Sequence, residues 1–427
     1  MREEYLLALL MLGAVAVGEI LTRNHPRWWA PALLLAAVAG SLAAGMGLRF
    51  REIVEGPFGF LDALLPCVVG MIFLRVLKDN GAWDALLGRL VGKSPLASSF
   101  GALLFLALPG MLTGFASASV LMSARPVYSY LRSRGADKAK AVGFIAVGAF
   151  LGMMLPPNSI PAIVAANGAG SVLPTPYVGF FLPLLVLTLP AFLLFGLMSA
   201  PLFKGPAPEP EKGKLLPLLP LLAVLLLVLV DGLLGSYVYV GGQVIIFLVG
   251  ILLAFLLPAQ RRGPKAAFDT LLQGTADMAV PAAAVLALGS FIEVSSMNGV
   301  RGIFSYHILP WTNGDMTYGV MLVLMALALV VGFFLSAPLP AFFITYAVFP
   351  IGWLANTVIV TGCAAAVGAA YLIAFRGGAF SRAKEELQAE DVSYTQVLCQ
   401  LILPALLVTV MGVIMVIFGD KMTGLIL

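Results

Sequence analysis

The sequence predicts an all-α, polytopic membrane protein built from two inverted-topology repeats, and three observations carry that prediction. Hydrophobic residues make up 61% of the 427 residues and charged residues only 11%, and the mean hydropathy is +1.02. Apolar segments of about 20 residues, the length that crosses a bilayer as a helix, recur along nearly the whole chain. The hydrophilic linker rich in proline and glycine, residues 204–214, falls almost at the midpoint.

Composition also limits the partners and the chemistry. The net charge of +4 is small and is confined to the predicted loops, so we expect a lipid bilayer around the protein and no nucleic-acid partner. Cys67, Cys363 and Cys399 lie singly in apolar segments and the chain has only two histidines, so neither a disulfide nor a metal centre is expected. Because the sequence offers no cluster of His, Asp or Glu with a nucleophile, it does not indicate an enzyme.

The first half contains four apolar segments that are long enough to span. We place spanning helices at about 5–22, 30–48 and 57–77, and a further one at about 176–203. The stretch 49–56, RFREIVEG, is too charged to cross the membrane. Its composition favours a short interfacial helix.

Between these spans, small residues and prolines interrupt the apolar segments. The apolar run at about 96–108 is too short to cross and meets the sequence PGMLTGFASAS at 109–119. The return arm is also short and ends in a basic loop at 125–140. We therefore predict a re-entrant hairpin over 96–131 with its tip at 109–119.

The next helix, expected at about 139–154, is interrupted by Pro156-Pro157-Asn158-Ser159 and resumes to about residue 171. Proline removes a backbone hydrogen bond inside a helix and glycine lowers helix stability, so both interruptions leave backbone polar groups that lipid cannot satisfy. Broken hydrophobic segments of this kind are typical of the binding sites of transporters. We interpret residues 108–161 as half of a solute site. The alternative is that the small residues only allow close helix packing.

The second half repeats this order. Sliding the halves over each other by 218 positions places Gly56 on Gly274 and Asn80-Gly81 on Asn298-Gly299. The expected elements are spans at 215–234 and 240–257, a charged arm at 261–273, a third span ending at Asn298-Gly299, a broken stretch at 332–342, and spans at 357–375 and 397–418. The chain thus divides into a first repeat (1–203), a linker (204–214) and a second repeat (215–427).

With the interrupted helix at 139–171 counted, the first half crosses the membrane five times, as the second half does. Because five is an odd number, the second repeat is inverted relative to the first. Basic residues gather in alternate loops, and this asymmetry places both termini outside the cytoplasmic (inner) membrane. The basic loops lie at about 23–27, 78–93, 125–140, 204–214, 261–265 and 376–384. The two hairpins then enter from opposite faces, and their tips are expected to meet near mid-membrane.

Three runs carry a family resemblance: T-G-x-A-S-A-S at 113–119, G-A-D-K-x-x-A-V-G at 135–143 and G-x-x-L-P-P-N-S-I-P at 152–161. They resemble the large, DctM-like membrane subunit of tripartite ATP-independent periplasmic (TRAP) transporters, in the ion transporter superfamily. The resemblance implies an elevator-type, sodium-coupled importer of a small carboxylate such as a C4-dicarboxylate. It also implies two partners, a periplasmic substrate-binding protein and a small four-helix membrane subunit.

The resemblance and the two interruptions together define a candidate site. Sodium is the expected coupling ion, and no other cofactor is expected. The expected cation-binding residues are Gly110, Ser119, Pro156, Pro157, Asn158 and Ser159. The residues expected at the organic anion are Thr113, Gly114, Ser117, Asn158, Ser336 and Arg376.

The second half departs from the family pattern. Its tip reads Ser336-Ala337-Pro338-Leu339-Pro340, and the position that answers Pro157 is Arg376, which leaves open whether a second sodium site exists. A guanidinium there is suited to hold a carboxylate through two parallel hydrogen bonds, and a cytoplasmic anchor obeying the positive-inside rule is the alternative. Glu293, an acid within a predicted span, is a further candidate unless it reaches the external surface.

Two other functions stay open on the sequence alone. One is a stand-alone, cation-coupled transporter of organic anions that needs no binding protein. The other is a channel or a structural membrane subunit. A channel needs a continuous polar stripe along several helices, and the sequence shows none.

Overall fold

The computed structural model describes most of the chain and contains only helices, turns and irregular segments there. The described residues are 2–21, 25–92, 94–168, 177–206, 213–234, 242–257, 263–308, 310, 316–335, 340–341 and 356–426. Their α-helices are α1 (Arg2–Leu21), α2 (Trp29–Ala43), α3 (Phe50–Asp79), α4 (Ala82–Leu90), α5 (Pro95–Thr113), α6 (Ala116–Ser133), α7 (Lys138–Met154), α8 (Ile160–Gly168), α9 (Phe181–Ser199), α10 (Leu219–Leu234), α11 (Gly242–Leu256), α12 (Pro264–Met297), α13 (Val300–Ile308), α14 (Met316–Leu335), α16 (Thr357–Ile373), α17 (Ala379–Glu386) and α18 (Tyr394–Ile426). Eight helices among these residues are long and apolar enough to cross a membrane, which confirms the all-α, polytopic class.

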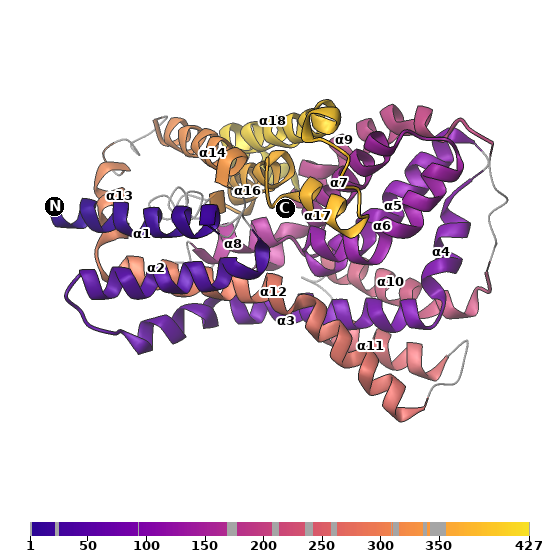
Figure 1. Cartoon of the computed structure of the whole chain (residues 1–427), viewed down its shortest axis with the longest axis horizontal. Helices are drawn as coiled ribbons and strands as arrows, with labels where there is room; N and C mark the ends of the chain where they lie inside the picture. The colour runs from indigo at the N-terminus through magenta and orange to yellow at the C-terminus, as the bar shows by residue number, and fades with distance from the viewer. Residues whose placement is uncertain are drawn as a thin grey trace.

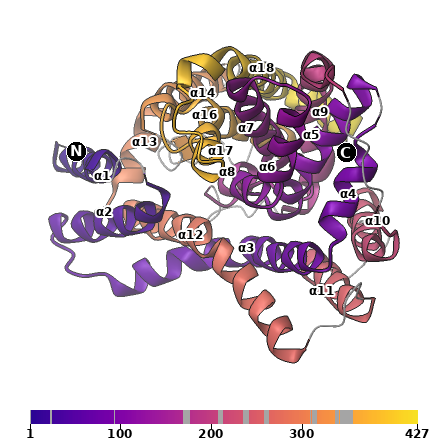
Figure 2. The same ribbon diagram turned by 45° about the vertical axis from the view of Figure 1, so that its right-hand side comes forward.

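The helices form two parts that lie side by side (Figure 1). We call α1, α2, α3, α10, α11 and α12 the long-helix layer; of the described helices, α3 and α12 pack against each other most extensively. We call α5 to α9 with α14, α16, α17 and α18 the hairpin bundle, in which α16 packs on α18 and α5 on α7. Figure 2 shows the same division from a second direction. The two parts touch where α3 and α12 meet α5, α6 and α8.

The predicted hairpin is present as α5 and α6, which pack together and turn at Gly114. Gly114 has φ +73°, a left-handed conformation that favours glycine at the end of a helix. Pro109 lies inside α5, although a proline there removes the hydrogen bond to the carbonyl of Phe105. The hydroxyl of Ser123 on α6 donates to that carbonyl at 3.0 Å. α5 therefore reaches 19 residues, which is long enough to cross a membrane by length and composition, so the prediction that this arm is too short is wrong. That the hairpin is re-entrant stays a prediction.

The predicted interruption after the hairpin is also present. α7 ends at Met154 and α8 begins at Ile160, so Pro156 to Ser159 lie between two helices as expected. Asp137 starts α7, because its side chain accepts a hydrogen bond from the backbone N–H of Lys140 at 3.1 Å.

The predicted interfacial helix at 49–56 is not a separate element. From Phe50 the chain continues without a break into the third span, which makes α3 30 residues long. Pro57 removes the helical hydrogen bond to the carbonyl of Ile53. The hydroxyl of Ser290 on α12 donates to this carbonyl at 2.6 Å, so the helix passes through the proline. The prediction fails because the compensating group comes from a segment more than 200 residues away.

α12 has the same form as α3. The predicted charged arm at 261–273 merges with the third span of the second half from Pro264 onward, giving a helix of 34 residues. α3 ends at Asn80-Gly81 and α12 at Asn298-Gly299, and these glycines have φ values of +72° and +82°. The two longest helices of the long-helix layer thus end in the same way.

α3 and α12 are held at close range by small residues and by one ion pair. A Cβ atom on Gly56 would lie 2.4 Å from the carbonyl oxygen of Gly289, so only glycine allows the two backbones to approach this closely. Arg75 of α3 and Asp277 of α12 form an ion pair, and both side chains are mostly buried. Charged groups inside such a layer persist when they are paired.

The described part of the second half has a helix at each of the two expected final spans, but only α18 is long and apolar enough to cross a membrane, and α16 is shorter. α16 corresponds to the predicted span at 357–375, and α18 includes the span at 397–418 but is longer. Residues 336–339 and 342–355 lie outside the described residues, as do 207–212 of the linker. The second hairpin tip, the boundaries of the repeats and their inverted relation therefore stay predictions.

Candidate functional site

The hairpin tip and the broken helix meet directly inside the hairpin bundle. Asn158 donates its backbone N–H to the carbonyl of Met111 at 3.3 Å and its side-chain Nδ2 to the carbonyl of Leu112 at 2.8 Å. Ile160, the first residue of α8, donates its N–H to the carbonyl of Gly114 at 3.3 Å. The side chain of Asn158 is buried. Carbonyl groups at the C-terminal end of α5, which have no partner within that helix, thus accept hydrogen bonds from the residues between α7 and α8 and from the start of α8.

Hydroxyl side chains complete the hydrogen bonding within the hairpin. Ser119 accepts from the backbone N–H of Gly110 at 2.8 Å, and Thr113 donates to the carbonyl of Pro109 at 2.6 Å. A Cβ atom on Gly110 would lie 2.8 Å from the carbonyl carbon of Gly152 on α7. Glycine is therefore required for α5 to lie against the end of α7.

Eight of the predicted residues of the first half gather around this contact, and we call them the tip–break cluster. They are Gly110, Thr113, Gly114, Ser119, Pro156, Pro157, Asn158 and Ser159. The oxygens of the cluster belong to carbonyl, amide and hydroxyl groups, which are neutral. Among the described residues no three His, Cys, Asp or Glu side chains are close enough together to hold a metal ion. A neutral oxygen set of this kind suits a monovalent, hard cation.

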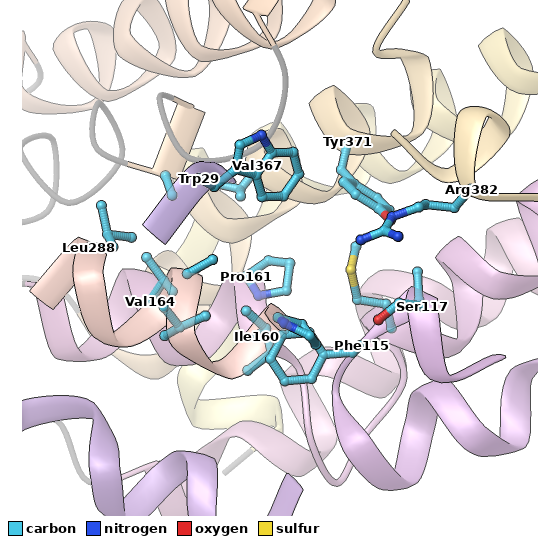
Figure 3. A pocket seen from close by; sticks show the side chains of 16 residues that line it. Trp29, Phe115, Ser117, Ile160, Pro161, Val164, Leu288, Val367, Tyr371 and Arg382 are labelled. Carbon is cyan, nitrogen blue, oxygen red and sulfur yellow. The ribbon is translucent and has the colours of Figure 1, made fainter. Parts of the chain in front are cut away.

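A cavity of about 120 Å³ adjoins the cluster, between the hairpin bundle and the long-helix layer. On the bundle side its wall includes Ser117 at the start of α6 and Ile160 at the start of α8 (Figure 3). On the opposite side the long-helix layer contributes Trp29 from α2 and Leu288 from α12. The first N–H groups of a helix have no partner within that helix and carry partial positive charge, so the start of α6 favours an anion here. The start of α8 contributes less, because the N–H of Ile160 already donates to the carbonyl of Gly114 and Pro161 has no N–H.

Arg382 of α17 is the charged side chain on the described wall of this cavity. Figure 3 shows its guanidinium beside the end of the Tyr371 side chain and near Ser117. Its side chain is half-buried, and within the part of the chain that the structure describes it makes no hydrogen bond or ion pair. A guanidinium that is partly removed from water and has no carboxylate partner attracts an anion, and its planar fork matches a carboxylate.

A wider vestibule of about 390 Å³ adjoins the cavity and shares Arg382 with it. The vestibule contains three acidic side chains, and each of them is next to a basic group. The pairs are His25 with Glu385 at 3.8 Å, Arg125 with Glu386 at 2.8 Å, and Arg75 with Asp277. Asp277 and Glu386 are therefore paired with arginines other than Arg382, and Glu385 lies nearest to His25 among the described basic groups that pair with it.

The residues predicted at the anion are distributed over three places. Ser117 lines the cavity, whereas Thr113 and Gly114 lie in the tip–break cluster behind it. Arg376 is exposed, its guanidinium lies 5.7 Å from the centre of the Phe375 ring, and it does not line the cavity. The alignment of the two repeats pairs Arg376 with Pro157, but Arg376 precedes α17, which begins at residue 379. That helix places Arg382, and not Arg376, on the wall of the cavity. Ser336 lies outside the described residues.

The sequence pattern alone points to none of three important wall residues, namely Arg382, Tyr371 and Trp29. By composition Arg382 is one more basic residue of a loop that is predicted to be cytoplasmic. The signal that identifies it is the short helix α17, which buries Ala379 and Ala383. Arg382 is adjacent to that buried face, so its side chain is directed toward the interior of the protein.

Comparison with known proteins adds the fold. No protein-family model matches the sequence, and no curated protein matches it. The structure is similar to the crystal structure of the YdaH transporter from Alcanivorax borkumensis, which is described as having an unusual topology. The similarity covers 93% of this chain and 98% of YdaH, with a TM-score of 0.64 and 14% sequence identity. The resemblance to the TRAP subunit stays a prediction, and the chain has the fold of a multi-pass membrane transporter.

Proposed function

We propose that this chain is a secondary transporter that carries a small organic anion into the cell together with sodium. The observation that carries the proposal is the half-buried side chain of Arg382, which lines the cavity and has no carboxylate partner among the residues that the structure describes. The hydroxyl of Ser117 and the first turns of α6 and α8 lie on the same cavity. A helix start, such as that of α6, and an arginine side chain are both suited to bind a carboxylate.

The tip–break cluster is the proposed sodium site. Asn158 uses its amide nitrogen to hold the carbonyl of Leu112, so its side-chain oxygen is the atom left for a cation. Ser119 and the backbone carbonyls of the tip supply further neutral oxygens. Because the same hairpin tip borders the anion cavity, a cation that orders the tip also fixes the start of α6. This arrangement couples the two solutes through shared structure.

Transport requires the site to face each side of the membrane in turn. The cavity lies between the two parts of the molecule, with Arg382 and Ser117 on the hairpin bundle and Trp29 and Leu288 on the long-helix layer. The polar groups therefore belong to one part and the facing wall is mainly apolar. We propose that the hairpin bundle moves with its solutes past the long-helix layer, as in an elevator mechanism, and that the two halves are inverted repeats.

The TRAP resemblance supports two partners for this permease, a periplasmic substrate-binding protein and a small four-helix membrane subunit. The alternative is that the chain works alone as a cation-coupled transporter of organic anions. Accumulation of an acid by proteoliposomes that contain only this chain would favour the second alternative. Accumulation that begins only when both partners are added would favour the first.

The experiment that tests the function uses proteoliposomes with an inward sodium gradient and a panel of radiolabelled small organic acids, with and without the two partners. We expect at least one acid to accumulate, and we expect potassium not to replace sodium. Arg382→Gln is expected to reduce the initial rate to less than a tenth. Arg376→Gln, a change of the exposed arginine six residues earlier, is the matched control and is expected to retain transport. Equal rates in the two variants, or accumulation without sodium, would contradict the proposal.

A further inference from the structure

The wall of the cavity changes character from one end to the other (Figure 3). Arg382, Tyr371 and Ser117, which carry polar groups, lie together on one side. Val164 and Leu288 lie on the other side, and the remaining wall is formed mainly by further apolar side chains. A ligand that fills the cavity therefore meets one cationic end and a remainder that is apolar apart from the indole N–H of Trp29.

We propose that the cavity selects monocarboxylates with a compact, branched or ring-shaped apolar tail over dicarboxylates. This inference rests on the proposed function, because Arg382 is the group that holds the carboxylate. The tail would lie between α8 and α12, against Val164 and Leu288. Burial of that tail removes apolar surface from water on both partners and supplies affinity without a second charge.

A dicarboxylate fits this wall poorly. Arg382 is the charged side chain on its described part, so a second carboxylate within the cavity would lie against apolar groups with no cation beside it. An ionised carboxylate without a partner is strongly disfavoured in such surroundings. Of the other basic residues of the vestibule, Arg125 is already paired with Glu386, and Arg27 does not line the cavity.

The volume sets the size of the tail. An apolar cavity of roughly 150 Å³ accommodates a benzene-sized molecule. The present cavity, at about 120 Å³, is slightly smaller, so we expect a tail of about five non-hydrogen atoms. Each methylene added up to that size is expected to tighten binding about fourfold, from the free energy of burying one methylene. Tails beyond that size require the wall to move and are expected to bind more weakly.

The test measures binding rather than transport, by calorimetry on the purified full-length protein in lipid nanodiscs at saturating sodium. The probes are acetate, pentanoate, 4-methylpentanoate and decanoate, with succinate as the dicarboxylate and 4-methylpentanamide as the uncharged analogue. We expect 4-methylpentanoate to bind at least tenfold more tightly than acetate, succinate or decanoate. We expect the amide to bind more weakly than the acid by a similar factor, because it cannot pair with the guanidinium.

Variants separate the tail from the head group. Leu288→Ala is expected to weaken the binding of 4-methylpentanoate about tenfold and to leave the binding of acetate unchanged. Val164→Ala, on α8 instead of α12, is a second variant at the apolar end of the cavity. Leu272→Ala, a change of an exposed leucine on the same helix α12, is the control and should alter neither affinity.

The outcomes distinguish the two proposals. Succinate binding as tightly as 4-methylpentanoate, with both lost in Arg382→Gln, would overturn the selectivity and leave the proposed function standing. Such a result would place a second carboxylate in the vestibule. Binding of no acid, or acid binding that Arg382→Gln does not change, would overturn the proposed function itself.

Discussion

Gly114 is the single position at which a small change separates the hairpin tip from the broken helix. Gly114→Ala adds one methyl group at φ +73°, which costs about 1–2 kcal/mol for an L-residue. That methyl group would also lie 3.2 Å from the backbone N of Ile160 and 3.4 Å from the carbonyl carbon of Asn158. Forcing the tip and the break apart to make room costs a further amount of about 1–3 kcal/mol. The expected loss of stability is therefore about 2–5 kcal/mol.

Gly135, in the connection between α6 and α7, provides a matched control. It has φ +77° and an added Cβ atom would meet nothing within 4 Å, so Gly135→Ala carries the backbone cost alone, about 1–2 kcal/mol. The assay is thermal unfolding of both variants in detergent, followed by tryptophan fluorescence over a series of sodium concentrations. We expect a larger loss in Gly114→Ala, together with weaker stabilisation by sodium. Equal losses with unchanged sodium dependence would refute the argument that the tip–break contact forms the cation site.

Two further predictions follow from the same structure. Asn158→Leu removes both the donor to the carbonyl of Leu112 and the side-chain oxygen, and we expect it to abolish sodium-dependent uptake. The control is Asn80→Leu, which removes a buried amide that donates to the carbonyl of Ala254 at 2.8 Å. This control variant should keep the sodium dependence. The second prediction concerns the orientation in the membrane and uses a chain without its native cysteines. We expect Gly302→Cys to react with an impermeant thiol reagent in intact cells and Lys204→Cys to be protected. The opposite pattern would show that the predicted topology is reversed.

The sequence was sufficient to locate the hairpin and the broken helix, because their signals are local. Gly114 is needed for a left-handed turn, and Pro156-Pro157 cannot continue a helix, whatever the rest of the chain does. The class of the protein is equally local, since it depends on the length and hydropathy of separate segments. The predicted positions of the tip and of the break therefore agree with the structure.

The features that sequence reasoning missed depend on contacts between distant segments. Pro57 and Pro109 read as helix breakers, yet Ser290 and Ser123 from other helices satisfy the carbonyls that these prolines leave. Ser290 lies 237 residues from Ile53, and Ser123 lies on the other helix of the hairpin, so neither hydrogen bond follows from the residues next to the proline. Arg382, the proposed anion residue, was missed for a related reason: pseudo-symmetry identifies a position along the chain, whereas the direction of a side chain depends on how a short helix such as α17 packs.

The most direct test of the account compares Arg382→Lys with Arg376→Lys, in the binding assay with the acid that binds most tightly. Both variants keep the positive charge, so membrane insertion and topology should be unaffected. Lysine lacks the planar fork that forms two parallel hydrogen bonds with a carboxylate. We predict that Arg382→Lys weakens binding by roughly tenfold or more, about 1.4 kcal/mol, and that Arg376→Lys binds as the wild type does. The reverse result would contradict the assignment of the cavity and would return the anion site to Arg376.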